Sequence, residues 1–256
     1  MKIVFSDFDR TLVNISKGSL GKDQLLVLSK LKMNEILFSI VTGRCFSFFR
    51  ESYPELIKVV SYFILSNGSS IYDVSRDCYI YHKFIDSCDL ERIYGYAKRY
   101  NLSIYFNLVE KRIRVGRGNY QHFDFNQMRC EQVVLMMENG NFNDLIDDVG
   151  CIDGVVINNK GIDSDNGNFF LDINKKGVSK GEGISYLYDY LKISGEDAIC
   201  FGDSDNDVSM FQVVGKKIAV SNASDSLKNI ADIVIGSDDD GSVFHYLSDF
   251  LNKDEV

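Results

Sequence analysis

Short apolar runs alternate with longer segments of helical period along most of this chain. The longer segments at residues 23–33 and 180–191 place most of their large apolar side chains on one helical face. Strands that alternate with helices in this way are typical of a parallel α/β sheet with covering helices. The runs that predict its strands lie at residues 2–6, 36–41, 61–65, 197–201, 216–220 and 232–235.

The pattern changes between about residues 83 and 178, where short strand-like runs lie close together and several are near Gly-Asn turns. This stretch predicts a separate α+β insert. The chain has no fixed-period repeat, and its single proline, Pro54, gives no linker signal. The predicted strands of the insert lie at residues 102–109, 112–115, 132–136, 155–158 and 169–173.

Polar residues cluster where four of the predicted core strands end. Because open α/β sheets bind ligands outside the carboxyl ends of their strands, segments far apart in sequence would meet in one crevice there. The four polar stretches are Asp7-Phe8-Asp9, Thr42-Gly43-Arg44, Ser66-Asn67-Gly68 and Gly202-Asp203-Ser204-Asp205-Asn206-Asp207.

Asp7 and Asp9 come directly after the first apolar run. In an extended chain the side chains at i and i+2 point the same way, so the two carboxylates would project from one edge of the sheet, about 7 Å apart. Two such anions repel each other unless a cation lies between them or one is protonated. A divalent metal with an acid/base pair is one interpretation of this stretch, and a solvated, Asp-rich turn is the other.

Two further residues offer groups that suit a phosphate. Thr42 has a hydroxyl beside a backbone N–H that Gly43 leaves uncrowded, which is typical of a phosphate cradle at a helix start and equally of an ordinary helix N-cap. Lys180, at the start of its predicted helix, could extend an ammonium group to a phosphoryl oxygen, although a lysine there is usually solvated.

The acidic run that follows the 197–201 strand has a competing interpretation. Asp203, Asp205 and Asp207 match the opening of a calcium-binding loop. Val208 and Val214 occupy the positions where such a loop needs glycine and glutamate, which argues against an EF-hand. The sequence also contains no phosphate-binding Walker loop and no Gly-x-Gly-x-x-Gly fingerprint.

The net charge and the placement of basic residues limit the classes of binding partner. The net charge of −9 argues against a nucleic-acid footprint and against an anionic membrane surface, so we expect neither partner. The one basic cluster of this acidic chain either faces an anionic substrate or lies on a solvent-exposed strand. It consists of Lys111, Arg112, Arg114 and Arg117.

Length and composition point to an intracellular globular protein. The 256 residues are 45% hydrophobic, enough for a substantial core. The apolar run before Ser6 is too short for a signal peptide, and no later run approaches a membrane span. The six cysteines form no Cys-x-x-Cys pair, so we expect reduced core thiols and a cytoplasmic protein.

Together, the motifs resemble those of the haloacid dehalogenase-like (HAD) phosphatases, and most closely the Cof-type branch. This resemblance implies a Rossmann-like parallel-sheet core at residues 1–82 and 179–256, interrupted by a C2-type α/β cap at residues 83–178. The stretches that carry it are, in order, Asp7-Phe8-Asp9-Arg10-Thr11-Leu12, Thr42-Gly43-Arg44, Ser66-Asn67-Gly68, Ser179-Lys180-Gly181 and the acidic run from Gly202 to Asp207.

The resemblance also implies roles for individual residues. Asp7 would be the nucleophile, and Asp9 would be the general acid and base. Mg²⁺ would be bound by the side chains of Asp7 and Asp203 and the backbone carbonyl of Asp9, with Asp207 close by. The implied phosphate- and substrate-binding residues are Thr42, Gly43, Arg44, Asn67, Lys180 and Asn206. One departure is Arg10, because glycine is most common after the second aspartate in this family.

The expected function is therefore a magnesium-dependent phosphatase that hydrolyses small phosphorylated metabolites, with sugar phosphates favoured, through an aspartyl-phosphate. We expect a monomer or a weak homo-oligomer. A phosphomutase or phosphotransferase would use the same intermediate but pass the phosphoryl group to a second hydroxyl. A non-catalytic phospho-aspartate switch is the alternative from another class.

Overall fold

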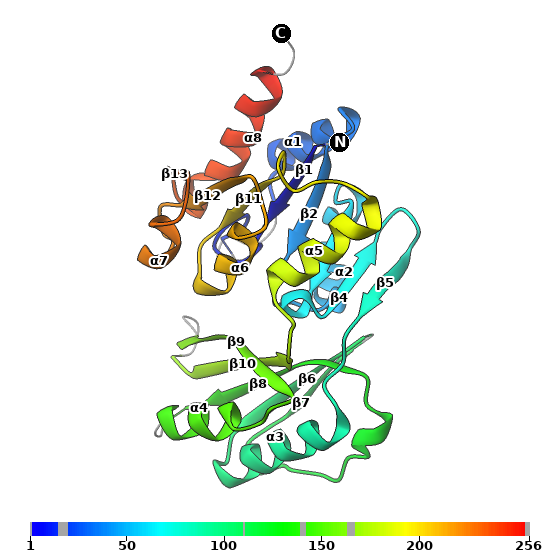
Figure 1. The fold of residues 1–256 in the computed structure, drawn as a ribbon, viewed down its shortest axis with the longest axis vertical. Helices are drawn as coiled ribbons and strands as arrows, with labels where there is room; N and C mark the ends of the chain where they lie inside the picture. The colour runs from blue at the N-terminus through cyan, green and yellow to red at the C-terminus, as the bar shows by residue number, and fades with distance from the viewer. Residues whose placement is uncertain (1, 15–19, 110, 139–141, 163–166, 254–256) are drawn as a thin grey trace.

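The computed structural model describes residues 2–14, 20–109, 111–138, 142–162 and 167–253. Within these residues the strands form two separate sheets (Figure 1). In spatial order, the larger sheet consists of β13 (Ile233–Ile235), β12 (Lys216–Val220), β11 (Ile199–Gly202), β1 (Ile3–Ser6), β2 (Leu37–Val41), β3 (Tyr62–Leu65), β4 (Ser70–Asp73) and β5 (Cys78–His82).

The six strands from β13 to β3 run parallel, which confirms the predicted α/β core. Strand β1 lies in the middle, and Val4 is paired with Phe38 on one side and Ile199 on the other. All four residues of β1 are buried, as expected for a strand covered on both faces. The helices of this part are α1 (Lys22–Met33), α2 (Phe46–Ser52), α5 (Lys180–Leu191), α6 (Val208–Phe211), α7 (Asp225–Lys228) and α8 (Ser242–Lys253).

Strands β4 and β5 extend the sheet in the antiparallel direction, which the sequence pattern did not predict. The turn Ser66–Gly68 reverses the chain between β3 and β4 within a few residues, and a parallel connection would need a dozen or more. Ser66, Asn67 and Gly68 all have positive φ angles, at 48°, 56° and 101°. Only glycine fits at position 68, because a Cβ there would lie 2.1 Å from the carbonyl oxygen of Ser179.

The smaller sheet is wholly antiparallel, and helices α3 (Ser87–Arg99) and α4 (Phe142–Gly150) cover one of its faces (Figure 1). Its apolar residues form a hydrophobic cluster distinct from that of the larger sheet. We propose domain boundaries at residues 83 and 178, as expected from the sequence. We call residues 83–178 the cap and the remaining residues the core. In spatial order, the cap strands are β7 (Arg112–Val115), β6 (Ser103–Leu108), β8 (Cys130–Met137), β10 (Phe169–Lys175) and β9 (Val155–Ile162).

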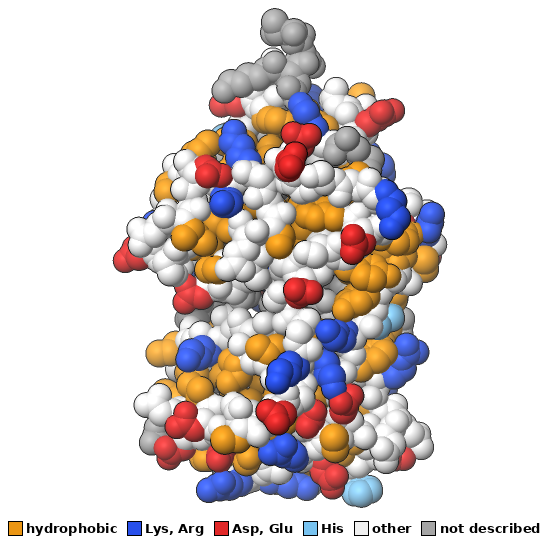
Figure 2. Space-filling model, in the orientation of Figure 1, with side chains coloured by type: hydrophobic (Ala, Val, Ile, Leu, Met, Phe, Trp, Pro, Cys, Tyr) orange, Lys and Arg blue, Asp and Glu red, His pale blue; other side chains and the backbone are white. Residues whose placement is uncertain are grey.

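The cap packs against the core through the turn after β3. The Asn174 side-chain amide donates hydrogen bonds to the Ser66 carbonyl at 2.8 Å and to the Ser69 hydroxyl at 3.0 Å. The Glu131 carboxylate of the cap accepts from the Ser66 hydroxyl and lies 2.9 Å from His82 Nδ1. Figure 2 shows the two parts in contact, with Lys and Arg side chains gathered on the cap just below the boundary on this face.

Two further expectations concern the state of the cysteines and whether a helix could cross a membrane. Cys45, Cys130 and Cys200 are buried and unpaired, as expected for reduced core thiols, whereas Cys78, Cys88 and Cys151 are exposed. Of the helices in the described ranges, none has the length and apolar character needed to cross a membrane.

Candidate active site

The sheet order brings the four predicted polar stretches together. Strands β11, β1, β2 and β3 are consecutive neighbours and run in the same direction. Their carboxyl ends therefore lie along one edge of the core, where Asp203, Asp7, Thr42 and Asn67 follow them. This arrangement agrees with the crevice expected at the carboxyl ends of an open α/β sheet.

Lys180 links the carboxyl end of β1 to the carboxyl end of β11. Its ammonium nitrogen lies 2.6 Å from Asp7 Oδ1 and 2.6 Å from Asp207 Oδ1, and its side chain is 1% exposed. Lys180 is the first residue of α5, and the Ser179 hydroxyl caps that helix by accepting from the backbone N–H of Glu182. Burial acts to lower the pKa of Lys180, but Asp207 and Asp7 outweigh it and raise the pKa, so the lysine is charged.

Asp207 and Asp203 are fixed by local hydrogen bonds. Asp207 Oδ2 accepts from the backbone N–H groups of Asp203 and Ser204 at 2.9 and 3.0 Å. Gly202 allows this close approach, since a Cβ there would lie 2.8 Å from the Asp207 carboxylate. Asp203 Oδ1 accepts from the Thr11 hydroxyl at 3.1 Å. Thr11 lies within the first motif, yet its contact with Asp203 could not be read from the sequence.

The buried carboxylates fit a divalent cation. Oxygens of Asp7, Asp203 and Asp207 lie within 4.8 Å of one another. Burial and the neighbouring carboxylates raise the pKa of Asp7 well above its usual value and raise that of Asp203 to about 6. Three ionised carboxylates beside one ammonium group give the cluster a net of two negative charges. Oxygen ligands suit a hard cation such as Mg²⁺. The donor set therefore matches a divalent ion in charge and in chemistry.

Asp9 is held apart from this cluster. Strand β1 ends at Ser6, so the extended geometry that would align Asp7 with Asp9 does not continue that far. Arg44 Nε lies 3.0 Å from Asp9 Oδ2, and the terminal nitrogen NH2 lies 3.1 Å from Oδ1. Although burial acts to lower the pKa of Arg44, its ion pair with Asp9 raises it. The two aspartates thus have different partners, and Asp9 remains partly open to solvent.

The turn after Asp9 has a backbone conformation that favours glycine. Arg10 has a φ of 62°, in the left-handed region, and its side chain is exposed. Its backbone N–H donates to the Val13 carbonyl, and its own carbonyl accepts from the Asn222 side chain at 2.8 Å. These hydrogen bonds hold the strained turn in place.

The remaining predicted residues lie along the next strand ends. The Thr42 hydroxyl accepts from the Arg44 backbone N–H at 3.1 Å. It does not cap a helix, because α2 starts at Phe46 and its N-cap is Cys45. Asn67 Oδ1 accepts from the Asn206 side chain at 3.2 Å. A Cβ at Gly43 would lie 3.3 Å from Asn67 Oδ1, so this turn is closely packed.

The cap contributes a residue that sequence reasoning missed. Asp172 Oδ2 on β10 accepts a hydrogen bond from Asn67 Nδ2 at 3.3 Å. Burial raises the pKa of Asp172 to about 6, although Asn67 and nearby arginines oppose this shift. The signal was the alternation in β10, where the polar Asp172 and Asn174 alternate with the apolar Leu171 and Ile173.

The chain is similar to known proteins along most of its length. The sequence model of the haloacid dehalogenase-like hydrolases matches residues 4–159 and 156–247. A phosphoglycolate phosphatase from Archaeoglobus fulgidus is 30% identical over 96% of this chain and 95% of its own length. Another phosphoglycolate phosphatase, from Sulfurisphaera tokodaii, is 29% identical over 98% of this chain and 94% of its own.

A solved structure has the same fold. A haloacid dehalogenase-like hydrolase from Bacillus subtilis superposes with a TM-score of 0.82, covering 97% of this chain and 99% of its own, at 18% identity. This likeness agrees with the fold of this chain. The chain belongs to the haloacid dehalogenase-like hydrolases, as a Cof-type phosphatase with an inserted cap.

Proposed function

We propose that the protein is a magnesium-dependent phosphatase of small phosphorylated metabolites that works through a phosphorylated Asp7. The observation that carries this proposal is the buried Asp7–Lys180–Asp207 arrangement with Asp203 beside it. A carboxylate can attack a phosphate dianion only where positive charge offsets their repulsion. Lys180 supplies part of that charge from 2.6 Å away.

The chain's own groups then account for both half-reactions. A carboxylate oxygen of Asp7 attacks phosphorus, and the bond from phosphorus to the leaving oxygen breaks. Asp9 gives its proton to that oxygen, then accepts a proton from the water that hydrolyses the aspartyl-phosphate, which restores Asp7 and releases phosphate. Because Arg44 engages both Asp9 oxygens, Asp9 must leave this ion pair to act as an acid.

Asp7, Asp203 and Asp207, with the backbone carbonyl of Asp9, would hold the magnesium ion. When bound, it supplies positive charge close to the phosphoryl oxygens. Thr42, Asn67 and Asn206, with the turn at Gly43, would orient the phosphoryl group from the adjoining strand ends. The cap would cover the leaving group and exclude water.

The test is release of inorganic phosphate from a panel of phosphorylated sugars, hydroxy acids and nucleotides with Mg²⁺ present. Asp7→Asn should lower kcat on the order of a thousandfold or more, because it removes the attacking group. Asp249→Asn, on the exposed side of α8, is the matched control and should retain wild-type kcat. Near-normal turnover by Asp7→Asn would refute the assignment of the nucleophile.

Two measurements separate the alternatives. A phosphotransferase would yield a new phosphorylated sugar when an acceptor is added, whereas a phosphatase yields phosphate alone. A phospho-aspartate switch would give a long-lived phosphorylated protein without turnover. Two of the relatives are named phosphoglycolate phosphatases, which supports a small acidic phosphoester as well as the sugar phosphates expected from the sequence.

A further inference from the structure

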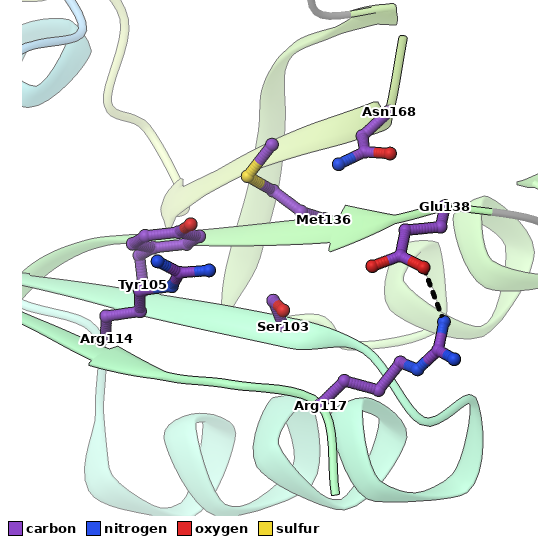
Figure 3. Close-up of a pocket in the computed structure, with 7 residues that line it drawn as sticks. All are labelled: Ser103, Tyr105, Arg114, Arg117, Met136, Glu138 and Asn168. Atoms are coloured by element: carbon purple, nitrogen blue, oxygen red, sulfur yellow. Dashed lines mark hydrogen bonds and ion pairs between the residues drawn. The ribbon is translucent and has the colours of Figure 1, made fainter. Parts of the chain in front are cut away.

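One face of the cap sheet is turned toward the core. Helices α3 and α4 pack on the opposite face through residues such as Phe106 and Leu135. The alternate positions therefore project from the free face. Cross-strand pairing places four of them in one row, which runs Asp172, Val134, Tyr105, Arg114. Figure 3 shows Tyr105 and Arg114 on the side of the sheet away from the helices.

The neighbouring row brings a second arginine to the same face. Asn174, Gln132, Asn107 and Arg112 are paired across the strands, so Arg112 lies two residues from Arg114 on β7. The Arg112 guanidinium lies 4.3 Å from the centre of the Tyr105 ring, and that of Arg114 lies 5.6 Å from it. The ring thus holds both cations by cation–π contact.

This face meets the core beside the candidate active site. Asp172 contacts Asn67 there. The Arg112 side chain is exposed, and Arg44 and Asp172 are among the charges that act on it. Arg112 thus lies on the same face of the cap sheet as Asp172, which contacts the turn after β3 through Asn67.

Arg112 and Arg114 differ from the other arginines of this region in their partners. Arg44 is paired with Asp9, and Arg117 is paired with Glu138 at 2.7 Å. Within the described ranges, no carboxylate forms an ion pair with Arg112. Arg112 and Arg114 thus lie together on Tyr105 with no ion pair to a carboxylate among the described residues, in a protein whose net charge is −9. An additional anion between the arginines would lower their mutual repulsion.

We propose that Arg112, held on Tyr105 beside Arg114, binds an acidic group of the leaving alcohol, so that the preferred substrates are phosphomonoesters with a second anionic group. That group is a carboxylate or a second phosphate, because the arginine fork suits both. This inference rests on the proposed phosphatase function and narrows its substrate class.

A pocket beside Tyr105 and Arg114 leaves room for the rest of such a molecule. It has a volume of about 240 Å³ and is also bordered by Ser103, Met136 and Asn168 and by the ion pair of Arg117 with Glu138 (Figure 3). Pockets for drug-sized ligands usually have about 300–1,000 Å³, so this pocket suits a small metabolite.

The test compares pairs of sugar-derived phosphoesters in which one member carries a second anionic group and the other does not. One pair is 6-phosphogluconate and glucose 6-phosphate, and the other is fructose 1,6-bisphosphate and fructose 6-phosphate. The first pair reports a carboxylate, and the second reports a second phosphate. The readout is the ratio of kcat/KM for the acidic and the neutral member, so any loss of folded protein cancels.

The wild-type ratio should exceed about ten in at least one pair, in line with a charged hydrogen bond that a neutral substrate cannot make. Arg112→Gln should lower that ratio about tenfold or more, and Arg112→Lys should restore part of it. Arg99→Gln is the matched control. It lies on α3 at the far side of the cap, paired with Asp148, and should leave the ratio unchanged.

Two outcomes would overturn the inference. In the first, the acidic members are not preferred, or Arg112→Gln keeps the wild-type ratio, while neutral esters are still hydrolysed. The proposed leaving-group site would then be wrong, and the phosphatase function would stand. If p-nitrophenyl phosphate, which needs no leaving-group site, is also not hydrolysed with Mg²⁺ present, the proposed function fails and this inference fails with it.

Discussion

Arg44 binds both carboxylate oxygens of Asp9, at 3.0 and 3.1 Å, while Asp7, two residues earlier, binds Lys180. The two aspartates of one short motif thus belong to different charge networks. Arg44 also lies 4.6 Å from the ring centre of Phe48, which restricts its movement. This separation suits one carboxylate that attacks and another that transfers protons.

Asp9→Asn should separate the two half-reactions. With p-nitrophenyl phosphate the leaving group needs no proton, so phosphorylation of Asp7 should continue, whereas the water that hydrolyses the intermediate loses its base. We expect a burst of about one nitrophenolate per active site, then steady-state turnover reduced by about a hundredfold or more. Rapid-quench or stopped-flow kinetics would measure both phases. If the substitution lowered the rate of the burst phase and the steady-state rate equally, the result would contradict the role of Asp9.

Lys180→Met should destabilise the fold in the absence of metal. The variant leaves the buried Asp7 and Asp207 without their shared cation, and removing one partner of a buried ion pair costs about 3–5 kcal/mol. Urea unfolding would measure the loss. Added Mg²⁺ should raise the stability of the variant more than that of the wild type, because it supplies the missing positive charge.

The control for this change is Lys22→Met, at the exposed start of α1. It should change the free energy of unfolding by less than about 0.5 kcal/mol, as is usual for surface substitutions. If Lys180→Met were as stable as this control without metal, the lysine would not be offsetting the buried carboxylates.

Asp172→Asn should stabilise the protein at alkaline pH. The pKa of Asp172 is raised to about 6 in the folded state, mainly by burial, so folding disfavours its charged form. That cost is present above about pH 6 and disappears as the pH falls through the folded pKa toward the ordinary value of about 3.9. Asparagine keeps an oxygen that can accept from Asn67.

The measurement is the Tm of the variant and the wild type across this range. The variant should melt higher near pH 8, and the two proteins should converge toward about pH 4. A gain that grew at acid pH would have the wrong sign and would contradict the buried environment assigned to Asp172.

Arg10→Gly should increase stability. Arg10 has a φ of 62°, a conformation that costs an L-residue roughly 1–2 kcal/mol but costs glycine little. Glycine also loses more backbone entropy on folding, so we expect a net gain of about 0.5–1 kcal/mol. Urea unfolding would measure it. Glu35→Gly, with a φ of 57°, should behave similarly, whereas Lys32→Gly inside α1 should lose stability.

Local pattern was enough to predict the core. The strands β1, β2, β3, β11 and β12 and the helix that starts at Lys180 were all predicted, because apolar runs and helical periods are properties of neighbouring residues. The edge where Asp7, Thr42, Asn67 and Asp203 meet was also predictable, since parallel strands present their carboxyl ends on the same side.

The tertiary structure decided which side chains meet. Asp9 contacts Arg44 and Asp172 contacts Asn67, although the residues of each pair are 35 or more positions apart. The antiparallel strands β4 and β5 depend on a turn with positive φ angles that no apolar period reveals. Such contacts depend on how a cap and a core pack together, and packing is a property of the whole chain rather than of any segment.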